Sequence, residues 1–318
     1  MLKKIKDALK KQHYSVVGEH SAVQICRWTK HSLLDEGFCY KQKFYGIKSH
    51  LCCQMSPAVM WCPNKCLHCW RAIELTLGDK IKGKTDSPTE IIEKCMQAQK
   101  KLLTGFKSNK KINLEKFKEA QEPTQFAISL SGEPTIYNQI GSLIEELRKR
   151  GKTSFLVTNG LYPEKLKELS TKKQLPTQLY VSLNTPNKEL YNKFHRSSKK
   201  DAWEKFNKTL ELLSKLATRK VIRMTLVRDL NMEDEQIKDY AKLIQKANPD
   251  FIEVKGYMSV GFARKRLGYE KMPTHEEVKD YAKKIAKELG LKILDEQEFS
   301  RVVLVGKDKK KMKIKEIR

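Results

Sequence analysis

The chain has 318 residues, 39% of them hydrophobic and 8% aromatic, which is enough for one large folded domain or two smaller ones and excludes disorder as the default. No window approaches the ~20 apolar residues of a membrane span, and the N-terminal segment MLKKIKDALKKQHY lacks the apolar core of a secretory signal. We therefore expect a soluble, cytoplasmic protein without a membrane partner, whose eight cysteines are metal ligands or redox groups before they are disulfides.

The formal net charge is +26, because 64 basic residues face only 38 acidic ones. A lysine-rich solvated surface of the thermophilic kind would be enriched in glutamate as well as lysine, whereas here the excess has one sign. Neutralisation of phosphates with release of counterions explains such an excess. The charge therefore favours a nucleic-acid partner over a general surface property.

Apolar segments bounded by turn signals alternate with amphipathic segments along most of the chain. The first long amphipathic segment begins with a capping box, in which Ser87 is followed by Pro88 and Glu90. Repeated strand–helix units imply an α/β fold with a parallel sheet, and six units make an incomplete (β/α)6 TIM-like barrel or a curved open sheet. The predicted strands lie within residues 53–61, 125–135, 153–160, 178–186, 221–229 and 250–258, and the predicted helices within 87–105, 138–151, 201–217, 233–247 and 274–290.

Three regions follow from this alternation. Residues 1–50 do not join it and form an N-terminal cysteine-bearing extension. Residues 51–290 carry the strand–helix units. Residues 291–318 resemble two short strands followed by the basic tail KDKKKMKIKEIR.

The loop CPNKCLHCW, residues 62–70, places Cys62, Cys66 and Cys69 in the spacing C-x-x-x-C-x-x-C. A disulfide would use two of these thiols, and a structural zinc ion needs four ligands, which only His68 or Cys53 could complete here. Three thiolates can instead bind three irons of a four-iron cluster and leave the fourth iron open. Because the loop follows the first predicted strand, it lies at the carboxyl edge of the sheet, where parallel α/β folds place their active sites.

This loop, followed by a series of strand–helix units, resembles the radical S-adenosylmethionine superfamily. The resemblance implies a [4Fe–4S] cluster whose open iron binds the amino and carboxylate groups of S-adenosyl-L-methionine, and whose reduction releases a 5′-deoxyadenosyl radical. It also implies that polar residues at the strand ends bind this cofactor. His68 stands where the superfamily often has an aromatic residue, and Trp70 is the alternative ring. The implied cofactor-binding residues are Gly132 and Glu133 of SGEPT, Thr158 and Asn159 of TNG, Ser182 and Asn184 of SLN, and Arg223.

Cys26, Cys39 and Cys52 of the extension are spaced thirteen residues apart. Such wide spacing suits neither a zinc finger nor a tight turn, and three separated thiols could hold a second cluster with one open iron. Ordinary buried cysteines are the alternative, and Cys53 could replace Cys52 as a ligand. Cys95 lies within a predicted helix and is interpreted as structural.

Together, these cysteines and the motifs CPNKCLHCW, SLSGEPT, VTNG and VSLN resemble the archaeal 4-demethylwyosine synthase family of wybutosine biosynthesis. The resemblance implies a lyase that condenses 1-methylguanosine beside the anticodon of tRNA-Phe with pyruvate to form a three-ring base. It further implies a second [4Fe–4S] cluster on Cys26, Cys39 and Cys52, with its open iron near pyruvate. Eukaryotic relatives carry a flavodoxin-like domain for which this chain has no room, so we expect an external electron donor. The alternatives are another radical S-adenosylmethionine RNA-modifying enzyme and a non-catalytic zinc-binding RNA module.

Pyruvate's ketone suggests a lysine, because a neutral amine forms a Schiff base with it. Lys41, Lys43 and Lys48 all lie between Cys39 and Cys52, and we favour Lys41 because it is two residues from a predicted ligand. The expected reaction begins with hydrogen abstraction from the N-methyl group, continues with addition to the pyruvate carbonyl carbon and loss of the carboxyl carbon, and ends in ring closure by imine exchange. The target base must flip out of its loop. Candidate stacking rings are Tyr40, Phe44, Tyr45, Tyr257 and Phe262, and the alternative is that any of them belongs to the core.

Overall fold

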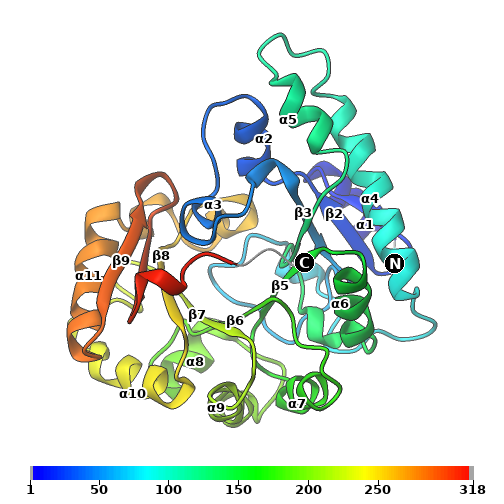
Figure 1. Cartoon of the computed structure of the whole chain (residues 1–318). Coiled ribbons are helices and arrows are strands. Elements are labelled where there is room, and N and C mark those ends of the chain that lie inside the picture. Colours follow the sequence, from blue (N-terminus) through cyan, green and yellow to red (C-terminus); the bar gives the residue numbers. More distant parts are fainter. Residues whose placement is uncertain (1–2, 315–318) are drawn as a thin grey trace.

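The computed structural model describes residues 3–314, which form one mixed α/β fold around a mostly parallel sheet (Figure 1). The strand order is β1-β2-β3-β4-β5-β6-β7-β8-β10-β9. Neighbouring strands from β3 to β8 are all parallel. These six strands are β3 (Cys52–Ser56), β4 (Gln125–Ile128), β5 (Thr153–Thr158), β6 (Gln178–Ser182), β7 (Arg219–Leu226) and β8 (Phe251–Gly256).

Antiparallel strands border the parallel ones on both sides. The N-terminal extension contributes β1 (Ser15–Val17) and β2 (Ser21–Gln24), of which β2 pairs with β3. The C-terminal region contributes β9 (Lys292–Gln297) and β10 (Val302–Gly306), of which β10 pairs with β8. The extension therefore lies outside the strand–helix alternation but inside the sheet. The division into residues 1–50, 51–290 and 291–318 stays a prediction.

Each predicted strand segment overlaps one parallel strand, although β3 and β7 begin one and two residues earlier than predicted and β3 ends earlier. Strand β3 ends at Ser56 because Pro57 has no N–H to donate to a neighbouring strand. The predicted capping box is confirmed, since the Ser87 hydroxyl accepts from the Glu90 N–H and the Glu90 carboxylate accepts from the Ser87 N–H at 2.9 Å.

Most helices surround the sheet on the outside, as Figure 1 shows, whereas α3 (Tyr40–Tyr45) packs on its inner face. The sequence did not predict the short helices α7 (Pro163–Thr171) and α8 (Lys188–His195), because their segments lack a long amphipathic pattern. The helices are α1 (Lys3–Lys11), α2 (Arg27–Leu33), α3 (Tyr40–Tyr45), α4 (Pro88–Thr104), α5 (Leu114–Glu119), α6 (Ile140–Lys149), α7 (Pro163–Thr171), α8 (Lys188–His195), α9 (Ala202–Leu213), α10 (Ile237–Ala247) and α11 (His275–Glu288).

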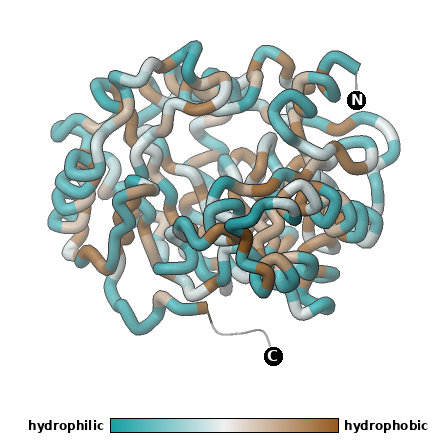
Figure 2. Tube along the Cα trace, turned by 90° about the horizontal axis from the view of Figure 1, so that it is seen from above, coloured by the Kyte–Doolittle hydropathy of each residue, from teal (hydrophilic) through white to brown (hydrophobic). Residues whose placement is uncertain are grey.

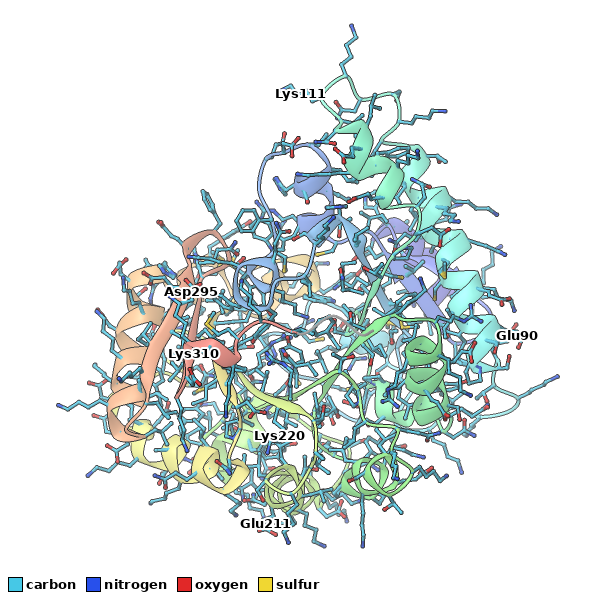
Figure 3. The ribbon with its side chains drawn as sticks, in the orientation of Figure 1. Glu90, Lys111, Glu211, Lys220, Asp295 and Lys310 are labelled. Carbon is cyan, nitrogen blue, oxygen red and sulfur yellow. The ribbon has the colours of Figure 1, made fainter. Side chains whose placement is uncertain are left out.

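The two faces of the parallel sheet bury different residues. The outer face packs alternate strand residues such as Leu156, Ile222 and Val254 against the surrounding helices. The inner face packs Phe155, Val221 and other strand residues against α3, β9 and β10. Hydrophobic segments gather inside the molecule in Figure 2, whereas the labelled side chains of Glu90, Lys111 and Glu211 lie at its outline in Figure 3.

Among residues 3–314, no helix is both long enough and apolar enough to cross a membrane.

Candidate active site

The cysteine loop follows β3 and is held in place by the end of helix α8. The Lys65 N–H donates to the His195 carbonyl at 2.9 Å, and the Leu67 N–H donates to the Phe194 carbonyl at 3.0 Å. Within the loop, the Cys69 N–H donates to the Cys66 carbonyl at 3.2 Å. The loop is therefore fixed between the carboxyl end of the first parallel strand and a helix more than a hundred residues further along the chain.

The loop gathers its three thiols in one place, as the sequence spacing predicts. The pKa of Cys62 is raised to about 11, chiefly by burial, with Glu133 and Cys69 acting in the same direction and Arg71 against them. The pKa of Cys66 is raised by burial and then by the other two cysteines. Such thiols are inert when protonated, and coordination to a metal is what holds buried thiols as thiolates.

Nitrogen atoms of neighbouring residues lie within hydrogen-bond distance of two of the three sulfur atoms. The Asn64 N–H donates to Cys62 Sγ at 3.4 Å, and the Asn159 amide lies 3.7 Å from the same sulfur. His195 Nδ1 lies 3.1 Å from Cys66 Sγ. Hydrogen bonds to the sulfurs and limited solvent exposure are the features by which proteins set the potential of an iron–sulfur cluster.

Two arginines that sequence analysis did not identify fix the loop backbone. Buried Arg71 donates to the Asn64 carbonyl at 2.5 Å and lies within electrostatic range of all three thiols. Arg266, almost two hundred residues away, donates to the carbonyls of Leu67, Cys69 and Arg71. Only the closeness of Arg71 to the motif could have indicated the first, and no sequence signal indicates the second.

A polar atom of the loop is buried without a hydrogen-bond partner among the described residues. It is Nδ1 of His68, whereas the amide of Asn64 and the hydroxyl of Ser131 lie within reach of the Tyr191 and Tyr14 hydroxyls. Buried polar groups normally have partners, so the His68 atom fits a site that receives a polar group. Within residues 3–314, no three His, Cys, Asp or Glu side chains surround one point closely enough for a single metal ion. A four-iron cluster needs no such point, since each thiolate binds a different iron.

Gly132 and Glu133 lie directly against the segment between β3 and the loop. Gly132 has a φ of +77°, and a Cβ atom there would stand 1.9 Å from the Ala58 carbonyl oxygen, so the position requires glycine. The Glu133 N–H donates to the Trp61 carbonyl at 2.7 Å. This close approach of backbones joins the ends of β3 and β4 beside the cysteines.

The Glu133 carboxylate joins the segment that follows β4 to the end of β5. It accepts from the Thr135 hydroxyl at 2.6 Å, the Thr158 hydroxyl at 2.8 Å and the Asn159 N–H at 2.7 Å. Burial raises the pKa of Glu133, against these hydrogen bonds. The structure thus brings Gly132, Glu133 and Asn159 together at Cys62, where the sequence predicts cofactor-binding residues.

Ser182 and Asn184 lie at the end of β6, on the next part of the same edge. Asn184 Oδ1 accepts from the Thr225 N–H at 3.0 Å, which fixes its side chain across β6 and β7. The binding of S-adenosylmethionine by these residues stays a prediction.

The three cysteines of the N-terminal extension form a second group. Cys26 and Cys39 immediately precede α2 and α3, and Cys52 begins β3. Burial and then Cys26 raise the pKa of Cys39 to about 11 and that of Cys52 to about 12, so the three thiols lie within electrostatic range of one another. Fully buried Cys53 points to the opposite face of β3, where it packs in the outer core with Cys95. The alternation of the strand therefore favours Cys52 over Cys53 as the third ligand.

The three candidate lysines have different surroundings. Lys41 is only 8% exposed, and its Nζ lies 4.8 Å from the ring centroids of both Phe155 and Tyr180. Lys43 and Lys48 expose 42% and 59% of their side chains and pair with Asp295 and Glu119. Lys41 is the member of this set that faces the interior beside the cysteines.

Buried charges from the inner face of β7 and β8 surround Lys41. Arg223 Nε donates to the fully buried Glu253 carboxylate at 3.0 Å, which also accepts from the hydroxyls of Tyr40 at 2.9 Å and Tyr45 at 2.7 Å. Burial alone would raise the pKa of Glu253, but Arg223 and Lys41 outweigh it and lower it. Removing one partner of such a buried pair costs about 3–5 kcal/mol. Burial and then Arg223 lower the pKa of Lys41.

The proposed stacking rings are mostly part of the core. Tyr40, Phe44, Tyr45 and Tyr257 are buried, so for these four rings the core alternative holds. Their apolar sequence neighbours could equally have indicated burial. Of the five, only Phe262 is partly exposed, and its N–H donates to the Trp70 carbonyl at 2.9 Å. Trp70 itself is 40% exposed beside the cysteine loop.

Comparison with known proteins agrees with this geometry. The radical SAM superfamily model matches residues 111–241, and a family model described as wyosine base formation matches residues 246–307. An S-adenosyl-L-methionine-dependent tRNA 4-demethylwyosine synthase from Pyrococcus horikoshii is 48% identical over 97% of this chain and 90% of its own length. A crystal structure of archaeal TYW1 is 33% identical with a TM-score of 0.78, covering 96% of both chains. A structure of TYW1 with a lysine-pyruvate adduct bound is 36% identical with a TM-score of 0.86, covering 100% of this chain and 99% of that chain.

A mostly parallel α/β sheet with three cysteines in a loop at the end of its first parallel strand defines a radical S-adenosylmethionine protein. The loop precedes the part matched by the superfamily model, but the relatives above cover it. The chain belongs to the family of S-adenosyl-L-methionine-dependent tRNA 4-demethylwyosine synthases.

Proposed function

We propose that this chain condenses 1-methylguanosine in the anticodon loop of tRNA-Phe with pyruvate to form 4-demethylwyosine. The observation that carries the proposal is the buried amine of Lys41 beside one group of three cysteines, in a chain with a second group at the mouth of its sheet. The solved relative that is 36% identical has a lysine-pyruvate adduct. An external electron donor supplies the electrons.

Cys62, Cys66 and Cys69 would hold the [4Fe–4S] cluster that binds S-adenosylmethionine, with Gly132, Glu133, Thr158, Asn159, Ser182, Asn184 and Arg223 as the proposed cofactor-binding residues. When bound, the cluster and the cofactor supply a 5′-deoxyadenosyl radical. The Nδ1 atom of His68, which is buried without a hydrogen-bond partner among the described residues, supports a polar group at this place. Arg71 and Arg266 hold the loop backbone so that the three thiols keep their arrangement.

Cys26, Cys39 and Cys52 would hold a second [4Fe–4S] cluster beside Lys41. The amine of Lys41 adds to the ketone of pyruvate, and the loss of one water molecule gives an imine. This step needs the neutral amine, and burial together with the charge of Arg223 favours that form. The aromatic rings of Phe155 and Tyr180 limit where the amine can lie.

The six parallel strands and their helices support the finer description of the fold as an incomplete (β/α)6 barrel. In such a barrel, both groups of cysteines and the inner charges face one enclosed space. The end of that space opposite the cysteine loop is filled by apolar side chains, among them Tyr45, Phe155 and Phe251. A substrate base therefore enters from the edge that carries the cysteine loop.

The net charge of +26 suits a tRNA partner, and the expected result is a steep dependence of tRNA affinity on salt. Each phosphate neutralised adds about 0.7 to 0.9 to the slope of log affinity against log salt. If at least five phosphates are contacted, affinity should fall about 100-fold or more between 50 and 200 mM salt. Filter binding or fluorescence anisotropy with tRNA-Phe measures this slope. A flat dependence would mean that the charge is a general property of the surface.

The test of the imine step is trapping of pyruvate with borohydride. The cluster-loaded protein should form a stable pyruvate adduct that mass spectrometry locates at Lys41, and Lys41→Ala should form no adduct and no three-ring base. Lys43→Ala is the matched control, because Lys43 lies in the same helix but pairs with Asp295 at the surface. An adduct that persists in Lys41→Ala would move the role to another lysine.

A further inference from the structure

The inner face of the sheet carries polar side chains in two levels. Register pairs Ser182 with Arg223 and Arg223 with Glu253, which places these three side chains at one level. Lys255 is paired with Thr225 one step nearer the carboxyl ends of the strands, on the same face of β8 as Glu253. Lys255 thus stands between the Arg223–Glu253 pair and the edge from which a substrate enters.

The cations at these levels differ in how many hydrogen bonds and ion pairs they make. Arg223 donates to Glu253 at 3.0 Å and to the Tyr40 hydroxyl at 3.0 Å, so its guanidinium is already bound. The Lys255 amine lies 4.2 Å from the centroid of the Tyr40 ring, and no hydrogen bond or ion pair within residues 3–314 involves it. The Lys41 amine likewise lies beside two aromatic rings and has no hydrogen bond or ion pair with any described residue. Three cations, Lys41, Arg223 and Lys255, therefore share one carboxylate, that of Glu253.

Partly buried cations normally have acidic partners, and the face of an aromatic ring replaces an anion only in part. Lys41 and Lys255 lie within electrostatic range of each other and of Cys39. Two amines without acceptors, close together in the interior, suit a ligand that has one group for each. A 2-oxo acid has such a pair, because its ketone and its carboxylate are on adjacent carbon atoms.

We propose that Lys255 binds the carboxylate of the 2-oxo acid whose ketone reacts with Lys41. This inference rests on the proposed function, since it takes the Lys41 imine as given. Imine formation uses one amine, and the neighbouring carboxylate then needs a cation. Lys255 is available, whereas Arg223 is held by Glu253 and Tyr40. Lys255 would thereby select 2-oxo acids against neutral ketones of the same size.

The test compares borohydride trapping of pyruvate with that of its methyl ester, which has the ketone but no charge. Lys255→Met in the cluster-loaded protein should raise the half-saturating concentration of pyruvate about 10- to 100-fold, the loss expected for a hydrogen bond to a charged group. The half-saturating concentration of methyl pyruvate should not change. Lys255→Arg, which keeps the charge, should remain within a few-fold of the wild type. Lys43→Met is the control for removal of a surface lysine.

Equal saturation by pyruvate in the wild type and in Lys255→Met would overturn the inference and leave the proposed function intact. Parallel weakening of pyruvate and methyl pyruvate would also overturn it, because Lys255 would then shape the site and not bind the carboxylate. If the wild type forms no adduct, the imine step fails and this inference fails with it. Iron content and circular dichroism show whether Lys255→Met is folded. If Lys255→Met is not folded, Lys255→Gln is tested in its place. The inference then requires that Lys255→Gln weakens saturation by pyruvate but not by methyl pyruvate.

Discussion

Replacement of Cys66 by alanine is expected to abolish reductive cleavage of S-adenosylmethionine while leaving the protein folded. The Cys66 side chain lies in a loop whose backbone is held by α8 and Arg266, so loss of one thiol does not remove those hydrogen bonds. A cluster with two of its three thiolates is not held in the arrangement that leaves a single open iron. The assay is formation of 5′-deoxyadenosine with a chemical reductant, and circular dichroism checks the fold. Cys62→Ala and Cys69→Ala should behave alike.

Cys95→Ala is the matched control, because Cys95 is a fully buried cysteine that packs within α4 in the outer core. Its replacement should leave deoxyadenosine formation unchanged and cost only stability, as removal of a small buried group does. Undiminished deoxyadenosine formation by Cys66→Ala would contradict the assignment of the loop as the ligand of the radical cluster.

Most of the parallel sheet could be predicted from sequence because its strands are apolar runs bounded by turns, and hydrophobic pattern is a local signal. The two C-terminal strands, β9 and β10, were also predicted, whereas the N-terminal antiparallel border was harder to predict. Strand β1 has three residues and β2 has four, which is too short for a pattern to emerge. Their place in the sheet depends on β2 pairing with β3, a contact between segments about thirty residues apart. The N-terminal extension therefore looked separate from a sheet to which it belongs.

The candidate site likewise contains residues that a local sequence pattern indicates and residues that no local pattern indicates. Cys62, Cys66 and Cys69 could be predicted because their spacing is written in nine consecutive residues. His195 and Arg266, which contact that loop, come from distant segments, and a lone histidine or arginine in a basic chain carries no signal of its own. The preference for Lys41 over Lys43 rested only on position in the sequence. Burial separates the two lysines, and burial here depends on how α3 packs against the inner face of the sheet.

Removal of all three cysteines of the N-terminal extension is expected to abolish formation of the three-ring base without abolishing cleavage of S-adenosylmethionine. The variant combining Cys26→Ala, Cys39→Ala and Cys52→Ala should keep about half of its iron, since it would lose one of the two proposed four-iron clusters. Its cysteine loop is attached to α8, Arg71 and Arg266 and not to the extension cysteines, so formation of 5′-deoxyadenosine should continue. Formation of the three-ring base should stop. Iron and sulfide analysis, deoxyadenosine yield and nucleoside analysis of tRNA-Phe measure the three quantities.

Neighbouring positions on β3 give the sharpest form of this prediction. Cys52 and Cys53 are adjacent, yet Cys52 faces Cys26, Cys39 and Lys41, whereas Cys53 is buried in the outer core. Cys52→Ala should therefore lower the iron content and abolish the product, and Cys53→Ala should do neither at the cost of some stability. Full iron content in the triple variant would mean that these thiols hold no cluster. Loss of iron by Cys53→Ala but not by Cys52→Ala would mean that the ligand lies on the other face of the strand.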